Sequence, residues 1–486
     1  MEAFSPGRPS SDRALGLYVA LIACAYAGVS GITTIYSLLS TLYRHFDAPT
    51  RIGWVVSGYF LVSAICAAIC GRFGDLLGRR RMTLVVLPVA AAGALISATS
   101  ATLDGVIVGC ALQGVAGALT PLTMGIAREA LPSARVPFAV GVIMAALVSG
   151  GGLSFAIAGV VIDLYSWTGG FYLKAVLAAI AFVAVLAFIP DHRAPAGEPR
   201  RVKVSVGLLF APGIAAFFIA AELAQSRGWT HPSVLALLSG ALVLLAVWAR
   251  HQAREEFPLI DVRMLVGRQV ALANLCFAFL CLGVMQNGQL VSLFLQQPAW
   301  TRTGFGLTAA GSGTIMFALL STALVAGPVS GALTTRRGGR DVALFGFMLG
   351  AAAWIGNAAY HRSFWLFIAM CMLGSVCVSV GQTAAYNLVI EATPRARTSE
   401  AVGLSTVVVS IFMAIGSQTV TALLASSRAI DLSHRLATLP GDAAYTLAFG
   451  FVGLMSLCGL IAAWALPRRR SPALVSHAPS CVRPDG

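Results

Sequence analysis

Charge is what this sequence contains least of. Asp, Glu, Lys and Arg make up 11% of its 486 residues, whereas a soluble domain carries about 25%. Hydrophobic residues make up 58%, and the mean hydropathy is +0.83. So much apolar surface, arranged in long runs, requires an apolar solvent, and the bilayer is that solvent. The composition therefore predicts an all-α polytopic membrane protein.

Motifs of catalysis and metal binding are also missing. The sequence has no CxxC pair, no HExxH, no phosphate-binding loop and no nucleophile elbow. Nine of the ten cysteines fall inside apolar segments, where a small side chain packs well between helices. We therefore expect no enzyme activity, no metal and no bound cofactor.

Long apolar runs set the expected architecture. A membrane helix needs about 20 mostly apolar residues, and fourteen runs of suitable length occur. They fall at approximately 15–38, 52–71, 82–102, 105–127, 137–163, 169–189, 205–224, 232–250, 270–296, 309–333, 342–361, 363–388, 401–425 and 445–466. An even number of spans places both chain ends on the same side of the membrane.

Basic residues alternate along these runs. Most of the 33 lysines and arginines fall in every second connection, which is the pattern of the positive-inside rule. The rule places those connections and both termini in the cytoplasm. Because topology accounts for the net charge of +14, we expect no nucleic-acid partner.

Two related polar segments indicate an internal repeat. GRFGDLLGRRR occupies residues 71–81, and GALTTRRGGR occupies residues 331–340. Each lies between the second and third helices of a six-helix half if two helices near the middle form an insert. The predicted regions are an N-terminal six-helix half at 1–190, a linker with a two-helix insert and an amphipathic segment at 191–269, a C-terminal six-helix half at 270–466, and a disordered basic tail at 467–486.

The first segment resembles the loop signature of the major facilitator superfamily, and the whole chain resembles its fourteen-helix drug:proton antiporters. The matching residues are Gly71, Asp75, Gly78, Arg79 and Arg80. The resemblance implies the major facilitator fold, with two six-helix halves plus a two-helix insert that work by alternating access. It also implies gating contacts between this loop and the other half, where Thr398-Ser399-Glu400 is the candidate helix start.

The chemistry of these side chains predicts roles that do not depend on the family resemblance. Gly71 allows helices to approach closely, and Gly78 permits a tight turn. Asp75 lies on the same helical face as Gly71, and its charge favours a nearby helix N-terminus or arginine. The arginines either join this latch or only set the topology. Because Thr335 occupies the position of Asp75 in the second segment, we expect the latch to be one-sided.

The sequence departs from the family pattern at three places. Cys110 stands where relatives carry an arginine, three residues before the pair Gln113-Gly114. Ser154-Phe155 replaces the Gly-Pro pair typical of antiporters, and Gly31 replaces an aspartate in the first helix. In the family, that arginine is associated with proton coupling, so these departures weaken the prediction of antiport.

Few ionisable residues fall inside the apolar runs, where they are costly unless paired or functional. Asp163 and Lys174 flank the short turn between the fifth and sixth helices. They either pair across this turn or take part in transport. Glu222, near the outer end of its helix, is a third candidate for coupling, although solvation at that end is the favoured interpretation.

Uncharged amides are the candidate substrate contacts. Gln286 and Gln289 are three residues apart and share one face of their helix. Because amides facing lipid are expensive, this face should line the central cavity or form interhelical hydrogen bonds. The same alternatives hold for the remaining candidates, Gln113, Gln382 and Gln418.

The expected function is secondary active export of small apolar or amphiphilic compounds (multidrug-type efflux), with a proton gradient as the energy source. An importer, a metabolite or lipid transporter of the same fold, and a non-transporting scaffold or sensor are the alternatives. The expected partners are a small-molecule substrate and the lipid bilayer. We expect a monomer in the plasma (inner) membrane, with both termini cytoplasmic.

Overall fold

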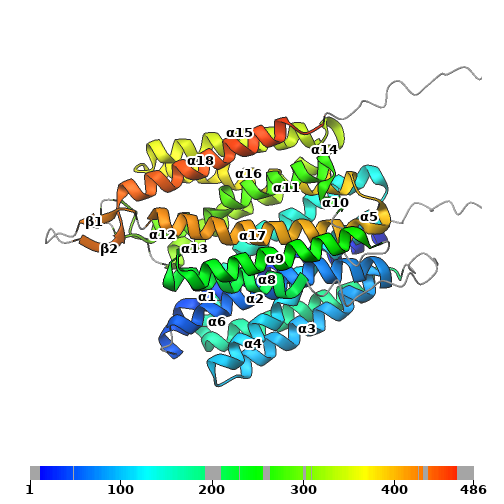
Figure 1. Ribbon diagram of the computed structural model, residues 1–486, viewed down its shortest axis with the longest axis horizontal. Coiled ribbons are helices and arrows are strands. Elements are labelled where there is room, and N and C mark those ends of the chain that lie inside the picture. The colour runs from blue at the N-terminus through cyan, green and yellow to red at the C-terminus, as the bar shows by residue number, and fades with distance from the viewer. Residues whose placement is uncertain are drawn as a thin grey trace, which may run out of the picture.

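The computed structural model is a bundle of long helices that lie side by side along one axis (Figure 1). It describes residues 11–46, 49–191, 210–228, 230–255, 263–298, 301, 303–307, 309–424, 426–430 and 436–467. Among these residues, thirteen helices are long and apolar enough to cross a membrane, and one further helix holds a shorter apolar segment. Each of the fourteen predicted runs overlaps one of them. The prediction of a multi-pass helical membrane protein is confirmed.

The first half contains six spans. Its elements are α1 (Ser11–Phe46), α2 (Pro49–Leu77), α3 (Arg79–Thr99), α4 (Leu103–Gln113), η1 (Gly114–Ala118), α5 (Leu119–Ala130), η2 (Ser133–Arg135) and α6 (Val136–Phe188). The α6 region holds two spans, because its second part returns along α1, with Gly170 against Leu38 and Phe188 against Gly16. The turn predicted between these spans is itself helical. The predicted fourth helix is divided by the 3-10 segment η1.

The insert and the second half continue the pattern. Their helices are α8 (Phe210–Arg227), α9 (Pro232–Arg254), α10 (Arg263–Val266), α11 (Arg268–Leu282), η3 (Val284–Gln286), α12 (Asn287–Gln296), α13 (Ala309–Ser321), α14 (Ala323–Arg337), α15 (Gly339–Tyr360), α16 (Phe364–Glu391), η5 (Arg395–Arg397), α17 (Thr398–Leu424) and α18 (Asp442–Trp464). Two features were not predicted: η3 interrupts the predicted ninth helix, and a short antiparallel hairpin, β1 (Arg428–Ile430) with β2 (Leu436–Pro440), precedes α18. Most of the predicted linker, residues 256–262 of the amphipathic segment and nearly all of the tail lie outside the described residues, so the division into four regions stays a prediction.

The two halves meet along two helix pairs, α2 with α17 and α6 with α14. Both pairs rely on glycine at points where backbones touch. A Cβ atom at Gly403 would overlap the carbonyl oxygen of Ala67, and one at Gly141 would overlap that of Gly327. The insert covers the first pair, because apolar side chains of α8 and α9 pack against those of α2 and α17. These contacts place the two copies of the repeated segment at the boundary between the halves.

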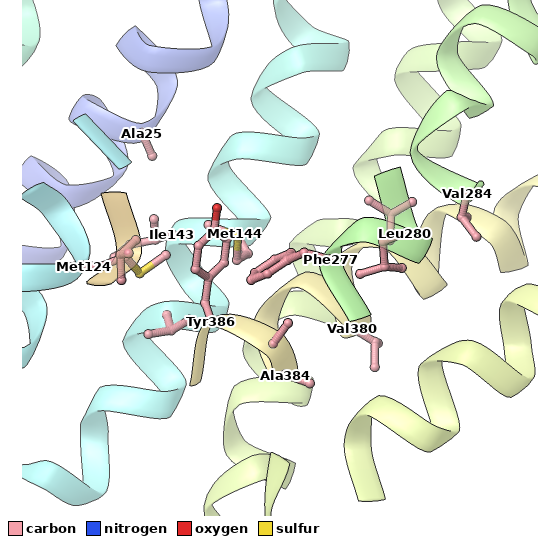
Figure 2. Close-up of a cluster of buried hydrophobic side chains, with 14 of the residues drawn as sticks. Ala25, Met124, Ile143, Met144, Phe277, Leu280, Val284, Val380, Ala384 and Tyr386 are labelled. Carbon is pink, nitrogen blue, oxygen red and sulfur yellow. The ribbon is translucent and has the colours of Figure 1, made fainter. Parts of the chain in front are cut away.

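An apolar cluster joins the halves between these pairs (Figure 2). Met124 and Met144 come from α5 and α6, and Phe277 and Tyr386 come from α11 and α16. The rings of Phe277 and Tyr386 lie 4.5 Å apart between centroids, and all four side chains are buried. We call these four residues the apolar plug. They lie about one and a half to two and a half turns in from the helix ends nearest to the basic residues described next.

Candidate functional site

One end of the bundle holds Arg72, Arg79, Arg128, Arg395 and Arg397, and we call it the basic end. Here the last turns of α2 meet the first turn of α17. The hairpin of β1 and β2 marks the opposite end (Figure 1).

Asp75 accepts hydrogen bonds from the start of α17. Its Oδ2 accepts from the backbone N–H of Glu400 at 2.9 Å, and its Oδ1 accepts from that of Ser399 at 3.3 Å. The first N–H groups of a helix have no partner within the helix and lie at the positive end of its dipole. A buried carboxylate at this place satisfies both, as the sequence predicted for Asp75.

Arg79 of α3 connects two further elements, α5 and η5, to this contact. It pairs with Asp75 at 2.8 Å and with Glu129 of α5 at 3.1 Å. It also donates to the carbonyl oxygen of Arg395 at 2.7 Å and to Ser399 Oγ at 3.0 Å. The side chain is 7% exposed, so both a charge and its hydrogen bonds are sealed between the halves.

A second ion pair lies beside the first. Glu400, whose side chain is fully buried, contacts Arg72 of α2 at 3.2 Å and Arg397 at 2.9 Å. Arg128 of α5 donates to Thr398 Oγ1 at 2.9 Å. Because Arg72 and Glu400 come from opposite halves, this pair also holds the basic end shut. We call the contacts of Asp75, Arg79, Arg72 and Glu400 the latch.

The other residues of the signature have local roles. A Cβ at Gly71 would lie 2.6 Å from the carbonyl oxygen of Ser399, so only glycine lets α2 approach α17 here. Gly78 has φ 105°, a conformation that side chains disfavour, at the turn between α2 and α3. Arg80 donates to the carbonyl oxygen of Leu186 at 3.2 Å, so it binds within its own half and not across the latch.

Sequence reasoning missed a repeat that the structure makes visible. Pro132-Ser-Ala-Arg135 and Pro394-Arg-Ala-Arg397 each form a 3-10 turn, η2 and η5, before a helix that carries Ala-Val-Gly in register. The repeat brings Gly331 of α14 against the carbonyl oxygen of Pro137, as Gly71 meets Ser399. This short repeated motif was the signal in the sequence that could have identified the partners of the latch on α17.

The same repeat explains why the latch is one-sided. Pro137 occupies the position of Ser399, and proline has no N–H to donate. A carboxylate in place of Thr335 would therefore lack one of the two backbone donors that hold Asp75. Thr335 instead donates to the carbonyl oxygen of Gly331 at 3.2 Å.

A second polar cluster lies inside the first half, in the membrane span. Lys174 of α6 donates to Gln113 Oε1 at 2.6 Å and lies 5.1 Å from the centre of the Tyr59 ring. Gln113 in turn donates to Ser97 Oγ at 3.0 Å. Lys174 forms no ion pair with any described residue, and the side chain of Asp163, its predicted alternative partner, lies outside the described residues.

The amides of the second half differ in their surroundings. Gln286 Nε2 donates to the carbonyl oxygens of Cys281 at 2.7 Å and Met413 at 3.2 Å, so it ties η3 to α17. This geometry agrees with the interhelical alternative. Gln289 accepts from Ser417 Oγ at 2.9 Å, and Gln382 donates to Met285 Sδ at 3.2 Å.

The side chains of Glu222 and Gln418 lie outside the described residues. Among described residues, no group of three or more His, Cys, Asp or Glu side chains could hold a metal, and the nine described cysteines are free.

Comparisons with known proteins agree with this architecture. A family model described as Major Facilitator Superfamily matches residues 19–301 and 275–479. The multidrug resistance protein B homolog of Mycobacterium tuberculosis is 26% identical over 73% of this chain, and the chain spans 66% of that relative, less than two thirds of its length. The tetracenomycin C resistance and export protein of Streptomyces glaucescens is 23% identical over 77% of this chain and 69% of its own. The crystal structure of a human organic anion transporter aligns over 94% of this chain and all of its own, with a TM-score of 0.65 at 14% identity, and so supports the fold.

Proposed function

This chain belongs to the major facilitator superfamily, and from that premise we propose that it exports small apolar or amphiphilic compounds, driven by a proton gradient. The family is one of membrane transporters, so the chain is a transporter and not an enzyme. The observation that carries the proposal is the latch. It closes one end of the boundary between the halves through contacts that can break as a unit, which is what alternating access requires.

Two layers of contact support a closed state at the basic end. The latch joins α2 to α17 through charged groups, and the apolar plug joins the halves further in. The latch residues are sealed between the halves. A substrate can pass this end only after both layers separate.

The arrangement of the ends supports the proposed orientation. Arg340 donates to the carbonyl oxygen of Trp464, so α18 ends at the basic end. Gly16 of α1 packs against Phe188, and Leu186 next to it accepts from Arg80 at the same end. Under the positive-inside rule this end faces the cytoplasm. We propose a plasma-membrane monomer with both termini inside and no nucleic-acid partner.

The substrate class is proposed from the relatives and the polar residues. Two relatives bear names that state multidrug resistance and export of tetracenomycin C. The amide of Gln382 donates to Met285 Sδ and retains hydrogen-bonding capacity for a neutral ligand. Such groups favour neutral or amphiphilic compounds over dications.

Flux in proteoliposomes tests the proposal. Purified protein is reconstituted and the movement of tetracenomycin C and of the dye ethidium is followed with and without an imposed pH gradient. We expect flux out of the compartment that the basic end faces, accelerated by a proton gradient directed the other way. Flux in the reverse direction would indicate an importer. Flux indifferent to the gradient would remove proton coupling, and no flux for a broad panel would favour a scaffold or sensor.

A further inference from the structure

Lys174 is the cation that the first half buries in its membrane interior. Its side chain is 3% exposed, and one amide oxygen, Gln113 Oε1, accepts from it. An ammonium has three N–H donors, so the described partners leave the charge incompletely satisfied. Unpaired ions within a bilayer are costly and are retained where they serve function.

The space for this ammonium is made by a glycine. A Cβ atom at Gly31 of α1 would overlap Lys174 Nζ and would lie 2.8 Å from the hydroxyl of Tyr59. Tyr59 of α2 donates to the carbonyl oxygen of Gly28 at 3.2 Å. Any larger residue at position 31 would displace either the cation or the tyrosine. The site is therefore shaped to hold the lysine terminus against α1 and α2.

Among the described residues, the groups that face the ammonium bring no counter-charge. Tyr59 faces it from α2, and Cys110 and Gln113 face it from α4. On α1 it meets Gly31, and Tyr36 of that helix interacts electrostatically with Tyr59. None of these described residues is a carboxylate. The protonation state of the cluster is therefore decided at Lys174 itself.

The acceptor is held in one orientation. Gln113 Nε2 donates to Ser97 Oγ at 3.0 Å and to the carbonyl oxygen of Gly93 at 3.3 Å. Ser97 Oγ lies 3.3 Å from the carbonyl oxygen of Val106. With the amide N–H groups used, Oε1 is directed at Lys174 and can accept from an ammonium or from an amine. Gln113 therefore keeps its hydrogen bond to Lys174 in both protonation states.

We infer that Lys174 binds and releases the proton that drives transport, an inference that rests on the proposed proton-driven export. In the release step one N–H bond of the ammonium breaks, its electron pair stays on nitrogen, and the proton passes to water. In the binding step the amine lone pair takes a proton from hydronium at the other side of the membrane, where an O–H bond breaks and water is left. Because the Lys174 side chain is 3% exposed, its site is too enclosed to hold a substrate, whereas its amine can still bind a proton.

Helix α2 connects this site to the latch. Tyr59 and Asp75 belong to the same helix, sixteen residues apart, which corresponds to about 24 Å. A shift of the Tyr59 contact with α1 when Lys174 changes charge would move α2 as a rigid element. The other end of α2 carries the carboxylate that holds α17. Proton binding and opening of the basic end are coupled through one helix.

The first experiment observes the proton directly. The sequence has only two lysines, Lys174 and Lys203, so protein labelled with ¹⁵N-lysine and carrying Lys203→Arg gives one side-chain nitrogen signal. We expect this Nζ resonance in reconstituted protein to move between its ammonium and amine positions within the pH range where a gradient drives transport. A resonance that stays at one position across that range would overturn the inference.

The second experiment separates coupling from transport. Lys174→Met removes the titrating group, and Lys174→Arg keeps a charge that does not titrate; Lys203→Met is the matched control. We expect both Lys174 variants to lose gradient-driven accumulation of tetracenomycin C at least tenfold while retaining substrate exchange, and the control to match the parent protein.

Failure of the inference is distinct from failure of the proposed function. If the parent protein accumulates substrate with the gradient and Lys174→Met does so equally, only the role of Lys174 is refuted. If the parent protein ignores the gradient, the proton-driven function is refuted as well. Should Lys174→Met fail to fold, Lys174→Arg and the resonance still decide the question.

Discussion

Asp75→Asn provides the sharpest test of the latch. The substitution preserves the shape of the side chain, removes its charge and replaces one acceptor oxygen with an N–H₂ group. Asp75 holds two backbone N–H groups of α17 and the guanidinium of Arg79, and its side chain is fully buried. Arg79 keeps its contact with Glu129, so the variant retains part of the network and should fold.

The expected magnitude follows from the hydrogen bonds and the ion pair that this substitution weakens. A hydrogen bond to a charged group contributes about 1.5–3 kcal/mol, and a buried charge left without its partner adds to the loss. Asparagine can still accept one of the two bonds, and Glu129 still compensates Arg79. We therefore expect the closed state of the basic end to lose about 2–3 kcal/mol relative to the open state. At about 1.4 kcal/mol per factor of ten, the open population rises about 30- to 150-fold.

Hydrogen exchange at the start of α17 measures this population. The amides of Ser399 and Glu400 are protected by Asp75, so they should exchange faster in the variant by the same factor. Asp191→Asn is the control, since its contact with Arg81 is 3.6 Å long and largely exposed, and such pairs contribute little. Unchanged exchange at residues 399 and 400, or unchanged transport in proteoliposomes, would refute the latch.

Three further predictions concern neighbouring features. Gly71→Ala should open the basic end in the same exchange assay because its Cβ would meet a backbone oxygen at 2.6 Å. Gly450→Ala is the control, because a Cβ there would have nothing within 4 Å. It should leave exchange at the basic end unchanged and stabilise α18 by up to about 1 kcal/mol. Thr335→Asp alone should not strengthen closure, but together with Pro137→Ser it should slow amide exchange at the start of α6; strengthening by the single variant would contradict the role of Pro137. Gln286→Ala should lower the free energy of unfolding by about 1–2 kcal/mol because it removes two hydrogen bonds, and an unchanged thermal midpoint with altered substrate preference would instead indicate a ligand contact.

The partners of the latch show how far the sequence could lead. The signature at residues 71–81 predicted that Asp75 would meet an arginine and the start of α17, and both contacts are present. Glu129 and Glu400 as ion-pair partners were not predicted, because they lie in other helices and no local pattern relates them to Arg79 or Arg72. Arg80, predicted as a gating residue, binds Leu186 within its own half.

Gln113 and Gln286 show more clearly what the sequence could not predict. From the sequence, Gln113 and Gln286 had the same two alternatives. The structure separates them, since Gln113 faces the buried ammonium of Lys174 while Gln286 bonds to α17. In a soluble helix an apolar stripe predicts which face points inward, but a membrane helix is apolar all round. Its rotation about its own axis is therefore not visible in the sequence.

The sequence by itself determined the solvent, the spans and the repeat. Scarce charge and long apolar runs require a bilayer, and the alternation of arginines predicts which side faces the cytoplasm. Tertiary structure alone decided which polar groups meet: Asp75 with the N–H groups of α17, and Lys174 with Gln113 in the space left by Gly31. The physical reason is that hydropathy places each helix in the membrane separately. A hydrogen bond acts over about 3 Å, so it depends on how helices that are distant in the sequence rotate and cross.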